Sequence, residues 1–378
     1  MSDSLKQDML AIIEGDKIPP GRAGLARILE FLSRGYGVGV RTRNSAFRRG
    51  ILPQRKLPCR VISIGNLTAG GTGKTPMTLY VAQRIRDMGY AAAVVSRGYM
   101  GHFEKHGGIV SDGSTTLCSL RESGDEPFML ARILSDVPVV VGKDRYGAGM
   151  TAVNRFSPDV IILDDAFQHQ GLYRDLNLVL VDRKAPLGNG HLLPRGRLRE
   201  PLTSLSRSHA VIFTRADRAG RDLEAEQAII RACKNRRPVF FATHLPVVCE
   251  PPAWRSTGAV MHRGKFPASD FSNKTGLLVS AIADNAGFRK TCENMGLKVK
   301  GHIEFPDHYW YKNRDLETIA ERFVRSSADI LVTTEKDAVK FPDSLPGEPE
   351  LVVLGVRIGF DPAGVKAFDQ MIEAVIKG

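Results

Sequence analysis

A glycine-rich turn between an apolar segment and a helix-like segment constrains this chain more than any other feature. It lies in VISIGNLTAGGTGKTPMTLYVAQRIRDMG, residues 61–89. β-Branched residues precede the turn, Lys74 and Thr75 close it, and apolar residues then recur at helical spacing. A strand, a glycine-rich loop and a helix in this order are typical of a phosphate-binding P-loop. The chain is therefore expected to fold as an α/β protein around a nucleotide site.

The loop residues supply the chemistry that phosphate groups require. Glycines let backbone N–H groups turn inward around phosphate oxygens, Lys74 neutralises the β- and γ-phosphates, and the Thr75 hydroxyl can bind Mg²⁺. Thr68 stands where the usual G-x-x-x-x-G-K-[ST] pattern has its first glycine, which is one departure. The predicted nucleotide-binding residues are Thr68, Ala69, Gly70, Gly71, Thr72, Gly73, Lys74 and Thr75. An incidental tight turn is the disfavoured alternative.

Alternating strand-like and helix-like segments follow Pro58, as in βαβ units on a parallel sheet. Strands are expected at 60–65, 91–95, 137–141, 159–163, 177–181 and 210–214, with helices such as 74–88 and 126–135. A smaller second part has strands expected near 237–242, 276–281, 329–333 and 351–356, and helices near 222–235, 284–296, 313–325 and 361–376. We predict an N-terminal basic amphipathic segment (1–57), a P-loop core domain (58–220) and a smaller α/β domain (221–378).

Acidic residues at two further positions complete the predicted site. Asp164 and Asp165 follow an apolar strand, where a P-loop protein places the carboxylates that organise Mg²⁺; the alternative is that they cap a helix. Asp125 opens a predicted helix in the sequence Gly-Asp-Glu-Pro, which alone indicates a routine helix cap. A parallel sheet would present this loop at the edge that holds the phosphates, so Asp125 is also a candidate base for a hydroxyl acceptor.

Other segments are candidates for lining the site, although each also has a structural interpretation. SRGY (96–99) ends a predicted strand, and HLLPRGRLREP (191–201) holds three arginines that either bind phosphate or are solvated. FPDHYWY (305–311) and TTEKD (333–337) either line a cleft or belong to the core and caps. His169 either orients a phosphate or a water, or is structural. Gly147–Ala152 matches the loosest dinucleotide pattern but follows no strand, so we reject it.

Charge is distributed unevenly along the chain. Its net charge is +12, and residues 1–60 hold twelve basic and five acidic side chains. Residues 22–40 predict a basic amphipathic helix, and residues 41–60 contain no acid. This bias fits an anionic membrane surface, a nucleic acid or a phosphorylated substrate; alternatively, the apolar stripe docks on the protein's own core. Five scattered cysteines, and the lack of a signal peptide or spanning segment, predict a reduced, cytosolic chain with at most peripheral membrane contact.

Seven motifs in this order resemble the tetraacyldisaccharide 4′-kinase family of lipid A biosynthesis. They are SIGNLTAGGTGKTP, SRGY, GDEP, DDAFQH, LLPRGRLREP, FPDHYWY and TTEKDAVK, between about residues 20 and 340. The resemblance implies two Rossmann-like α/β domains and transfer of the γ-phosphate of ATP, with Mg²⁺, to the 4′-hydroxyl of tetraacyldisaccharide 1-phosphate, a lipid A precursor. It also implies an enzyme peripheral to the cytoplasmic face of the bacterial inner membrane.

The resemblance assigns roles residue by residue. Lys74 and Thr75 would hold phosphates and metal, and Asp164 with Asp165 would complete the metal site. Asp125 resembles the catalytic base of the family, and His308 resembles the histidine that polarises it, a pairing that would need domain closure. Ala166 departs from the family's more usual glycine in DDGFQH.

Two other classes of function compete with the kinase interpretation. A P-loop switch or metal-delivery chaperone would hydrolyse nucleotide without a sugar acceptor, but the chain lacks paired Cys/His ligands and an N-K-x-D segment. A nucleic-acid-binding protein would interleave aromatic residues with its basic ones, and residues 41–60 offer only Phe47. We therefore expect no nucleic-acid partner, and no motif indicates a protein partner.

Overall fold

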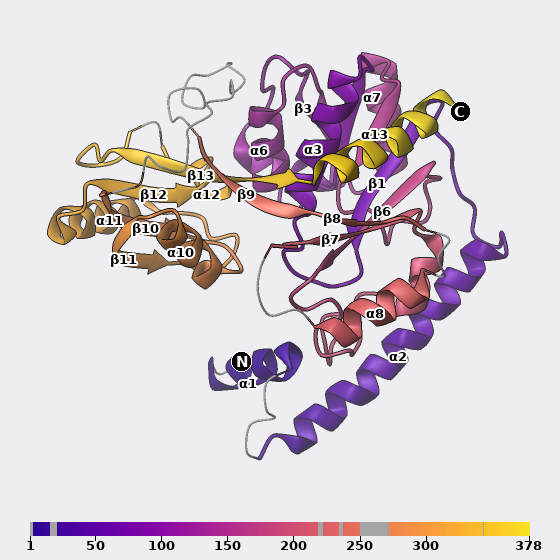
Figure 1. Ribbon diagram of the computed structural model, residues 1–378, viewed down its shortest axis with the longest axis horizontal. Helices are drawn as coiled ribbons and strands as arrows, with labels where there is room; N and C mark the ends of the chain where they lie inside the picture. The colour runs from indigo at the N-terminus through magenta and orange to yellow at the C-terminus, as the bar shows by residue number, and fades with distance from the viewer. Residues whose placement is uncertain are drawn as a thin grey trace. The chain divides into compact units, whose positions relative to one another are not determined.

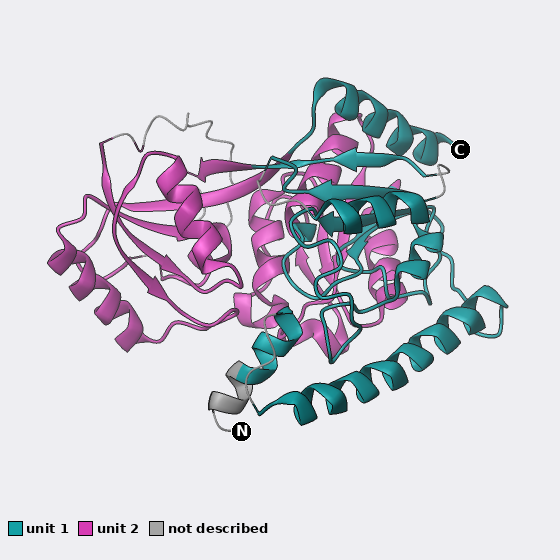
Figure 2. Cartoon of the chain, turned by 60° about the horizontal axis from the view of Figure 1, so that its bottom comes forward, with its two compact units in different colours: residues 1–74, 160–244, 359–378 teal, residues 75–159, 245–358 magenta. Residues whose placement is uncertain are grey.

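The computed structural model describes residues 3–15, 21–217, 222–233, 237–249, 271, 273–342 and 344–378. The chain divides into two compact units, shown in different colours in Figure 2: unit 1 comprises residues 1–74, 160–244 and 359–378, and unit 2 comprises residues 75–159 and 245–358. The domain boundary predicted at residue 220 falls in 218–221, outside the described residues, and stays a prediction.

Unit 1 is built on five parallel strands in the order β5-β1-β6-β7-β8. They are β5 (Val160–Leu163), β1 (Arg60–Asn66), β6 (Leu176–Asp182), β7 (Ala210–Thr214) and β8 (Val239–Phe241). The first four are almost entirely buried, which explains why their sequences are continuous apolar runs without alternation. Ser63 of β1 is in register with Leu163 of β5, so the loops that follow both strands leave the same edge.

The helices of unit 1 include the long N-terminal helix that the sequence predicts. They are α1 (Asp3–Glu14), α2 (Ala23–Arg48), the 3-10 helix η1 (Leu202–Arg207), α8 (Leu223–Ala232) and α13 (Pro362–Lys377), labelled in part in Figure 1. The prediction of 22–40 is confirmed, but α2 continues to Arg48. Gly50, with φ of 71°, ends it: the Gly50 N–H donates to the Phe47 carbonyl and the Ile51 N–H to the Ala46 carbonyl.

The first segment of unit 2 contains a short group of strands and its helices. The strands are β2 (Ala92–Ser96), β3 (Gly108–Ser111) and β4 (Val139–Val141), and the helices are α3 (Lys74–Asp87, whose first residue belongs to unit 1), α4 (Phe103–His106), α5 (Leu120–Ser123), α6 (Asp125–Ile133) and α7 (Arg145–Phe156). β2 and β4 are parallel, whereas β3 is antiparallel to β4. Residues 147–152 lie inside α7, so the rejection of a dinucleotide loop there is confirmed.

The second segment of unit 2 forms most of a five-stranded sheet in the order β11-β10-β12-β13-β9, in which the first two residues of β9 and the last residue of β13 belong to unit 1. Its strands are β9 (Thr243–Cys249), β10 (Thr275–Ser280), β11 (Lys298–Glu304), β12 (Ile330–Thr334) and β13 (Leu351–Gly359), and its helices are α10 (Asn285–Asn294), α11 (Asn313–Ser326) and the short α12 (Glu335–Ala338). Leu277 packs in one core cluster with α11, whereas Leu278 packs in another with α10. Because neighbouring strand residues face opposite ways, the two helices cover opposite faces of this sheet.

The predicted α/β class, with a mostly parallel sheet at the P-loop and a second α/β sheet, is therefore confirmed. Every predicted strand is present within two residues of its expected bounds, except that β13 runs three residues longer. No strand was expected at β3, β9 or β11, and no helix range was named for α1, α4, α5, α7 or α12. β11 reads KVKGHIE and has mostly exposed or half-buried residues, so it lacks the apolar run by which the central strands were found.

Candidate functional site

The glycine-rich loop connects β1 to α3, as the sequence predicts. Gly70 and Gly73 have φ of 114° and 84°, a backbone region that favours glycine. A Cβ on Gly73 would lie 2.6 Å from His244 Nε2, so a larger residue there would have to displace the His244 side chain as well as adopt the positive φ. Beneath the loop, the Asn66 amide donates a 2.8 Å hydrogen bond to Thr72 Oγ1, which is buried. The sequence therefore folds here into a fixed turn that ends at the N-terminus of α3.

Lys74 opens α3 beside the carboxylates that follow β5. Its Nζ lies 3.8 Å from Asp165 Oδ2, which is longer than a hydrogen bond, and the two side chains are 14% and 34% exposed. Asp165 has φ of 47°, a left-handed conformation that is uncommon for a residue other than glycine. Asp164 is buried with an exposed fraction of 2%. Among the described residues no helix follows this pair before β6, so the helix-capping alternative is wrong.

A close approach holds the Asp164–Asp165 turn beside β1. A Cβ on Gly65 would lie 2.5 Å from Phe167 Cβ, and the Ala166 N–H donates to the Ile64 carbonyl at 3.1 Å. Ala166 is fully buried. Gln168 Nε2 donates to the Asn66 carbonyl at 2.8 Å. The residues after β5 are thus fastened to the end of β1, which brings Asp165 to Lys74.

The three clustered arginines have different partners. Arg199 Nη1 contacts both carboxylate oxygens of Asp165 at 3.1 and 3.2 Å. Arg195 donates to the Ile12 carbonyl of α1 at 2.9 Å, and Arg197 pairs with Glu14 of α1 at 2.7 Å. Residues 197 and 198 also border the glycine-rich loop. The Ala69 N–H donates to the Arg197 carbonyl, and Thr68 forms an isolated antiparallel β-bridge with Leu198. Of the three guanidinium groups, that of Arg199 contacts the predicted metal carboxylates.

Asp125 lies in unit 2 as the first residue of α6. Gly124 before it has φ of 85°, and a Cβ there would lie 2.6 Å from the Tyr99 carbonyl oxygen, so the GDEP segment needs its glycine. Asp125 Oδ1 accepts the Glu126 N–H at 3.0 Å, and Oδ2 lies 2.9 Å from His308 Nδ1. The pairing suggested by the resemblance is therefore present within one unit, although 183 residues separate its partners.

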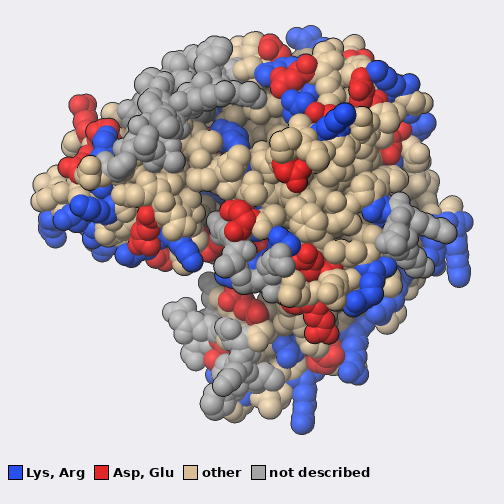
Figure 3. Space-filling model, viewed as in Figure 1, with Lys and Arg blue, Asp and Glu red and all other residues tan. Residues whose placement is uncertain are grey.

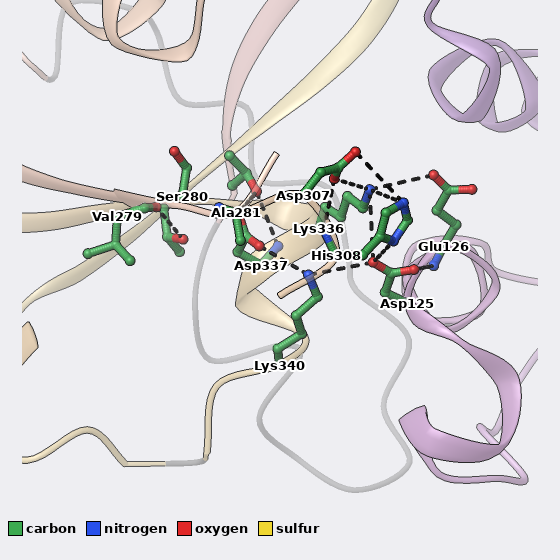
Figure 4. Close-up of polar contacts among 12 residues, drawn as sticks. Asp125, Glu126, Val279, Ser280, Ala281, Asp307, His308, Lys336, Asp337 and Lys340 are labelled. Carbon is green, nitrogen blue, oxygen red and sulfur yellow. Dashed lines mark hydrogen bonds and ion pairs between the residues drawn. The ribbon is translucent and has the colours of Figure 1, made fainter. Parts of the chain in front are cut away.

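Two lysines complete this cluster, which Figure 4 shows in close-up. Lys340 Nζ lies 3.5 Å from Asp125 Oδ2, and Lys336 Nζ lies 3.9 Å from the same oxygen. The Asp125 side chain is only 8% exposed. His308 has φ of 61°, so the histidine, like Asp165, occupies a strained left-handed conformation.

The surroundings of Asp125 favour its ionised form. Burial is the largest single effect and opposes ionisation, but the His308 hydrogen bond and the charges of Lys336, His308 and Lys340 together lower the pKa of Asp125 to about 2. The Asp125 hydrogen bond in turn raises the pKa of His308, and burial and Lys336 oppose that rise. Asp125 is therefore a carboxylate at neutral pH, ready to accept a hydrogen bond or a proton.

From the sequence, Lys336 belongs to TTEKD, which either lines a cleft or belongs to the core and caps, and Lys340 has no predicted role. Both come from TTEKDAVK, where they stand four residues apart, so that a helical turn directs them to one side. This spacing was the available signal, but nothing in the sequence specifies that Asp125 faces them.

The residues at the end of β5 and the start of α3 fit Mg²⁺. No group of three or more His, Cys, Asp and Glu side chains that could hold a metal occurs in the described part of the chain. Magnesium in a kinase needs only one or two protein carboxylates, because phosphates and waters complete its coordination. Asp164 and Asp165 provide hard oxygen ligands of this kind at the end of β5, and the Thr75 hydroxyl belongs to the first turn of α3.

Comparison with known proteins identifies the family. The family model described as tetraacyldisaccharide-1-P 4′-kinase matches residues 25–377. The tetraacyldisaccharide 4′-kinases of Desulfatibacillum aliphaticivorans and Syntrophus aciditrophicus (strain SB) are each 40% identical, over 89% and 94% of both chains respectively. The crystal structure of LpxK from Aquifex aeolicus in complex with ATP is similar with a TM-score of 0.73 and 30% identity, covering 93% of this chain and 99% of that one. The chain therefore belongs to the tetraacyldisaccharide 4′-kinase family.

Proposed function

We propose that this member of the family uses Asp125 to accept the proton of the acceptor hydroxyl while loop 68–75 and Lys74 hold ATP. The chain is an ATP-dependent kinase that transfers the γ-phosphate to the 4′-hydroxyl of tetraacyldisaccharide 1-phosphate in lipid A biosynthesis. The acceptor oxygen forms the new P–O bond, the bond from the γ-phosphorus to the bridging oxygen breaks, and ADP leaves. The hydroxyl proton passes to Asp125.

The observation that supports this assignment most directly is the buried Asp125–His308 pair. A general base must hold its lone pair at a fixed position, and His308 Nδ1 and the Glu126 N–H orient the two oxygens of the carboxylate. A routine helix cap would use the side chain to bind backbone N–H groups at the start of its helix. The additional histidine and two lysines around Asp125 have no place in such a cap.

For the nucleotide, the support comes from loop geometry and charge. The fixed glycine turn and the N-terminus of α3 suit phosphate oxygens, and the Lys74 ammonium is held only loosely by Asp165. Mg²⁺, when bound, supplies charge neutralisation between the β- and γ-phosphates. We assign Thr75, Asp164 and Asp165 to its protein ligands. Arg199 keeps Asp165 oriented through contacts to both carboxylate oxygens.

The first experiment is transfer of label from γ-³²P-ATP with Mg²⁺ to tetraacyldisaccharide 1-phosphate in detergent micelles, beside a sample without acceptor. We expect label in the lipid and little free phosphate. Release of free phosphate at the same rate with and without the acceptor would contradict the proposal and favour a switch-type NTPase.

We further propose that α2 binds the anionic surface of the inner membrane at its cytoplasmic face. The structure contains no described helix long and apolar enough to span a membrane. One face of α2 docks on its own unit, where Ser33 donates to the Leu192 carbonyl and Tyr36 to the Arg199 carbonyl. The outer face of α2 exposes large apolar side chains: the exposed fraction is 77% for Phe31 and 58% for Ile28. Part of the apolar surface of the helix therefore points outward.

Basic residues accompany this apolar face. Lys and Arg side chains stand along the lower right edge of Figure 3, where Figure 1 shows α2. An amphipathic helix of this kind binds at an interface through its apolar area and through attraction to anionic lipids.

Vesicle co-sedimentation tests the membrane proposal. Phe31→Asp is expected to weaken binding to vesicles containing anionic lipid by roughly tenfold, because it removes apolar area and adds a negative charge. The matched control is Val324→Asp on α11, which changes an apolar side chain that is 71% exposed. Equal losses from both variants, or no loss from Phe31→Asp, would contradict a specific role for α2.

A further inference from the structure

Lys336 is held in place by its two neighbours in α12. Asp337 is fully buried and its carboxylate accepts hydrogen bonds from the Ala281 N–H (2.9 Å) and the Thr334 hydroxyl (2.8 Å). Glu335 forms two contacts with Arg357, at 2.6 and 2.7 Å. These contacts fix α12 within unit 2. The Lys336 side chain therefore points from α12 in a defined direction, toward His308 (Figure 4).

The Lys336 ammonium lies among the groups that surround Asp125. Its Nζ is 3.2 Å from His308 Nε2, 3.0 Å from Asp307 Oδ1 and 3.7 Å from Glu126 Oε1. The side chain is 18% exposed. Burial opposes the charge, but Glu126, Asp125 and Asp307 outweigh it and raise the pKa of Lys336. Lys336 is therefore a stable cation that touches the imidazole on the side opposite Asp125.

This contact determines the tautomer of His308. An ammonium group has three donors and no acceptor, so a hydrogen bond to it requires a lone pair on His308 Nε2. The proton of the neutral ring then resides on Nδ1, from which it is donated to Asp125 Oδ2 at 2.9 Å. A doubly protonated ring would direct an N–H at the Lys336 ammonium, which is unfavourable both geometrically and electrostatically.

We propose that Lys336 is a positioning residue that limits protonation of His308 and holds the proton of the neutral ring on Nδ1, so that Asp125 is oriented by a hydrogen bond and is not held in a full ion pair with an imidazolium. This inference rests on the proposed role of Asp125 as the base. Asp125 faces the imidazole from α6, Asp307 from its own loop and Lys336 from α12, and the Tyr99 ring packs edge-on at 5.9 Å. Glu126 contacts Lys336 at 3.7 Å, and Lys340, in the turn after α12, contacts Asp125 at 3.5 Å. Among these groups, Lys336 is the cation in contact with Nε2.

The charge balance predicts the direction of the effect. Without Lys336, the carboxylates of Asp125 and Asp307 would act on His308 with less opposition, so the pKa of His308 would rise. A protonated His308 would hold Asp125 in a full ion pair and weaken it as a base. The acid limb of the pH profile of kcat/KM would therefore move to higher pH.

The test combines kinetics with ¹⁵N NMR of histidine-labelled full-length protein. Lys336→Met is expected to shift the acid limb and the His308 titration upward by about one pH unit. Lys336→Arg, which keeps the charge and the donors, is expected to restore both to near the values of the unmodified chain. Lys298→Met, at an exposed position on β11, is the control for loss of a surface lysine. The His308 signal among nine histidines is assigned by its absence in His308→Asn.

The outcomes separate this inference from the proposed base. The inference is overturned if the ring carries its proton on Nε2 above its pKa, or if Lys336→Met leaves the His308 titration unchanged. Should Lys336→Met fail to fold, Lys336→Gln takes its place, because it keeps an N–H donor and loses the charge. If Asp125→Asn leaves turnover unchanged while Lys336→Met still moves the His308 titration, the base assignment fails and the control of His308 by Lys336 stands.

Discussion

The glycine loop of unit 1 and the Asp125 cluster of unit 2 hold their charged groups in opposite ways. Lys74 meets Asp165 at 3.8 Å in a partly exposed pair, whereas Asp125 is buried and has a histidine, a backbone N–H and two lysines around it. An ammonium group in a partly exposed ion pair gains little free energy from that pair, so it can leave its partner and bind an incoming phosphate. A buried carboxylate must instead have its charge compensated by the protein itself. The glycine loop is thus arranged to bind the negative charge of a phosphate. The Asp125 cluster is arranged to keep the Asp125 carboxylate ionised and oriented.

Substitution of Lys74 tests the first half of this comparison and should have the largest effect. Lys74→Ala is expected to lower the kcat/KM of phosphoryl transfer by about 10³-fold, because no other side chain is assigned to neutralise the β- and γ-phosphates. Label transfer measures this, with exposed Lys366→Ala on α13 as the control. If a folded Lys74→Ala protein keeps near-normal activity, the proposed role of the loop and Lys74 in binding the phosphates of ATP is wrong.

Substitution of Asp125 tests the second half. Asp125→Asn is expected to lower kcat by about 10²-fold, the scale of a lost general base, while the KM for ATP changes less than about threefold. Glu321→Gln, at an exposed position on α11, controls for loss of a surface carboxylate. If kcat is unchanged, Asp125 is only a structural residue at the start of α6.

Acid stability distinguishes a compensated carboxylate from an ordinary one. The folded pKa of Asp125 is about 2, below its ordinary 3.8, so its contribution to stability is present above pH 4 and is lost as the pH falls toward 2. This contribution is about 2 kcal/mol. The urea midpoint of the unmodified chain should fall more steeply between pH 4 and pH 2 than that of Asp125→Asn. Parallel curves would show that the surroundings of Asp125 do not stabilise its charge.

The smallest expected effect concerns the support beneath the loop. Thr72→Val removes the acceptor of the buried 2.8 Å hydrogen bond from Asn66, and should lower the free energy of unfolding by about 1–2 kcal/mol. Urea unfolding measures this loss against Thr318→Val, an exposed position on α11. A loss no greater than that of the control would mean that the Asn66 amide finds another partner.

The part of the site that could be predicted from sequence is the part that lies close together in the chain. The loop, Lys74 and the start of α3 are contiguous, and Asp164 with Asp165 follow a strand whose apolar run is unmistakable. Gly124 and Asp125 were found in the same way, as a local segment. The role of Ala166 was not predictable, because its burial against β1 depends on the approach of Phe167 to Gly65.

The sequence by itself determined the α/β class, the central strands, the glycine turn and the chemical types of the site residues, because local order and apolar periodicity specify them. Only the tertiary structure decided which charges meet. Asp125 lies 183 residues before His308 in the chain, and Lys336 follows His308 by 28 residues. Arg195 and Arg197 contact α1, whereas Arg199 contacts Asp165. The physical reason is that an ion pair depends on distances of a few ångströms, and folding, not spacing along the chain, determines these distances.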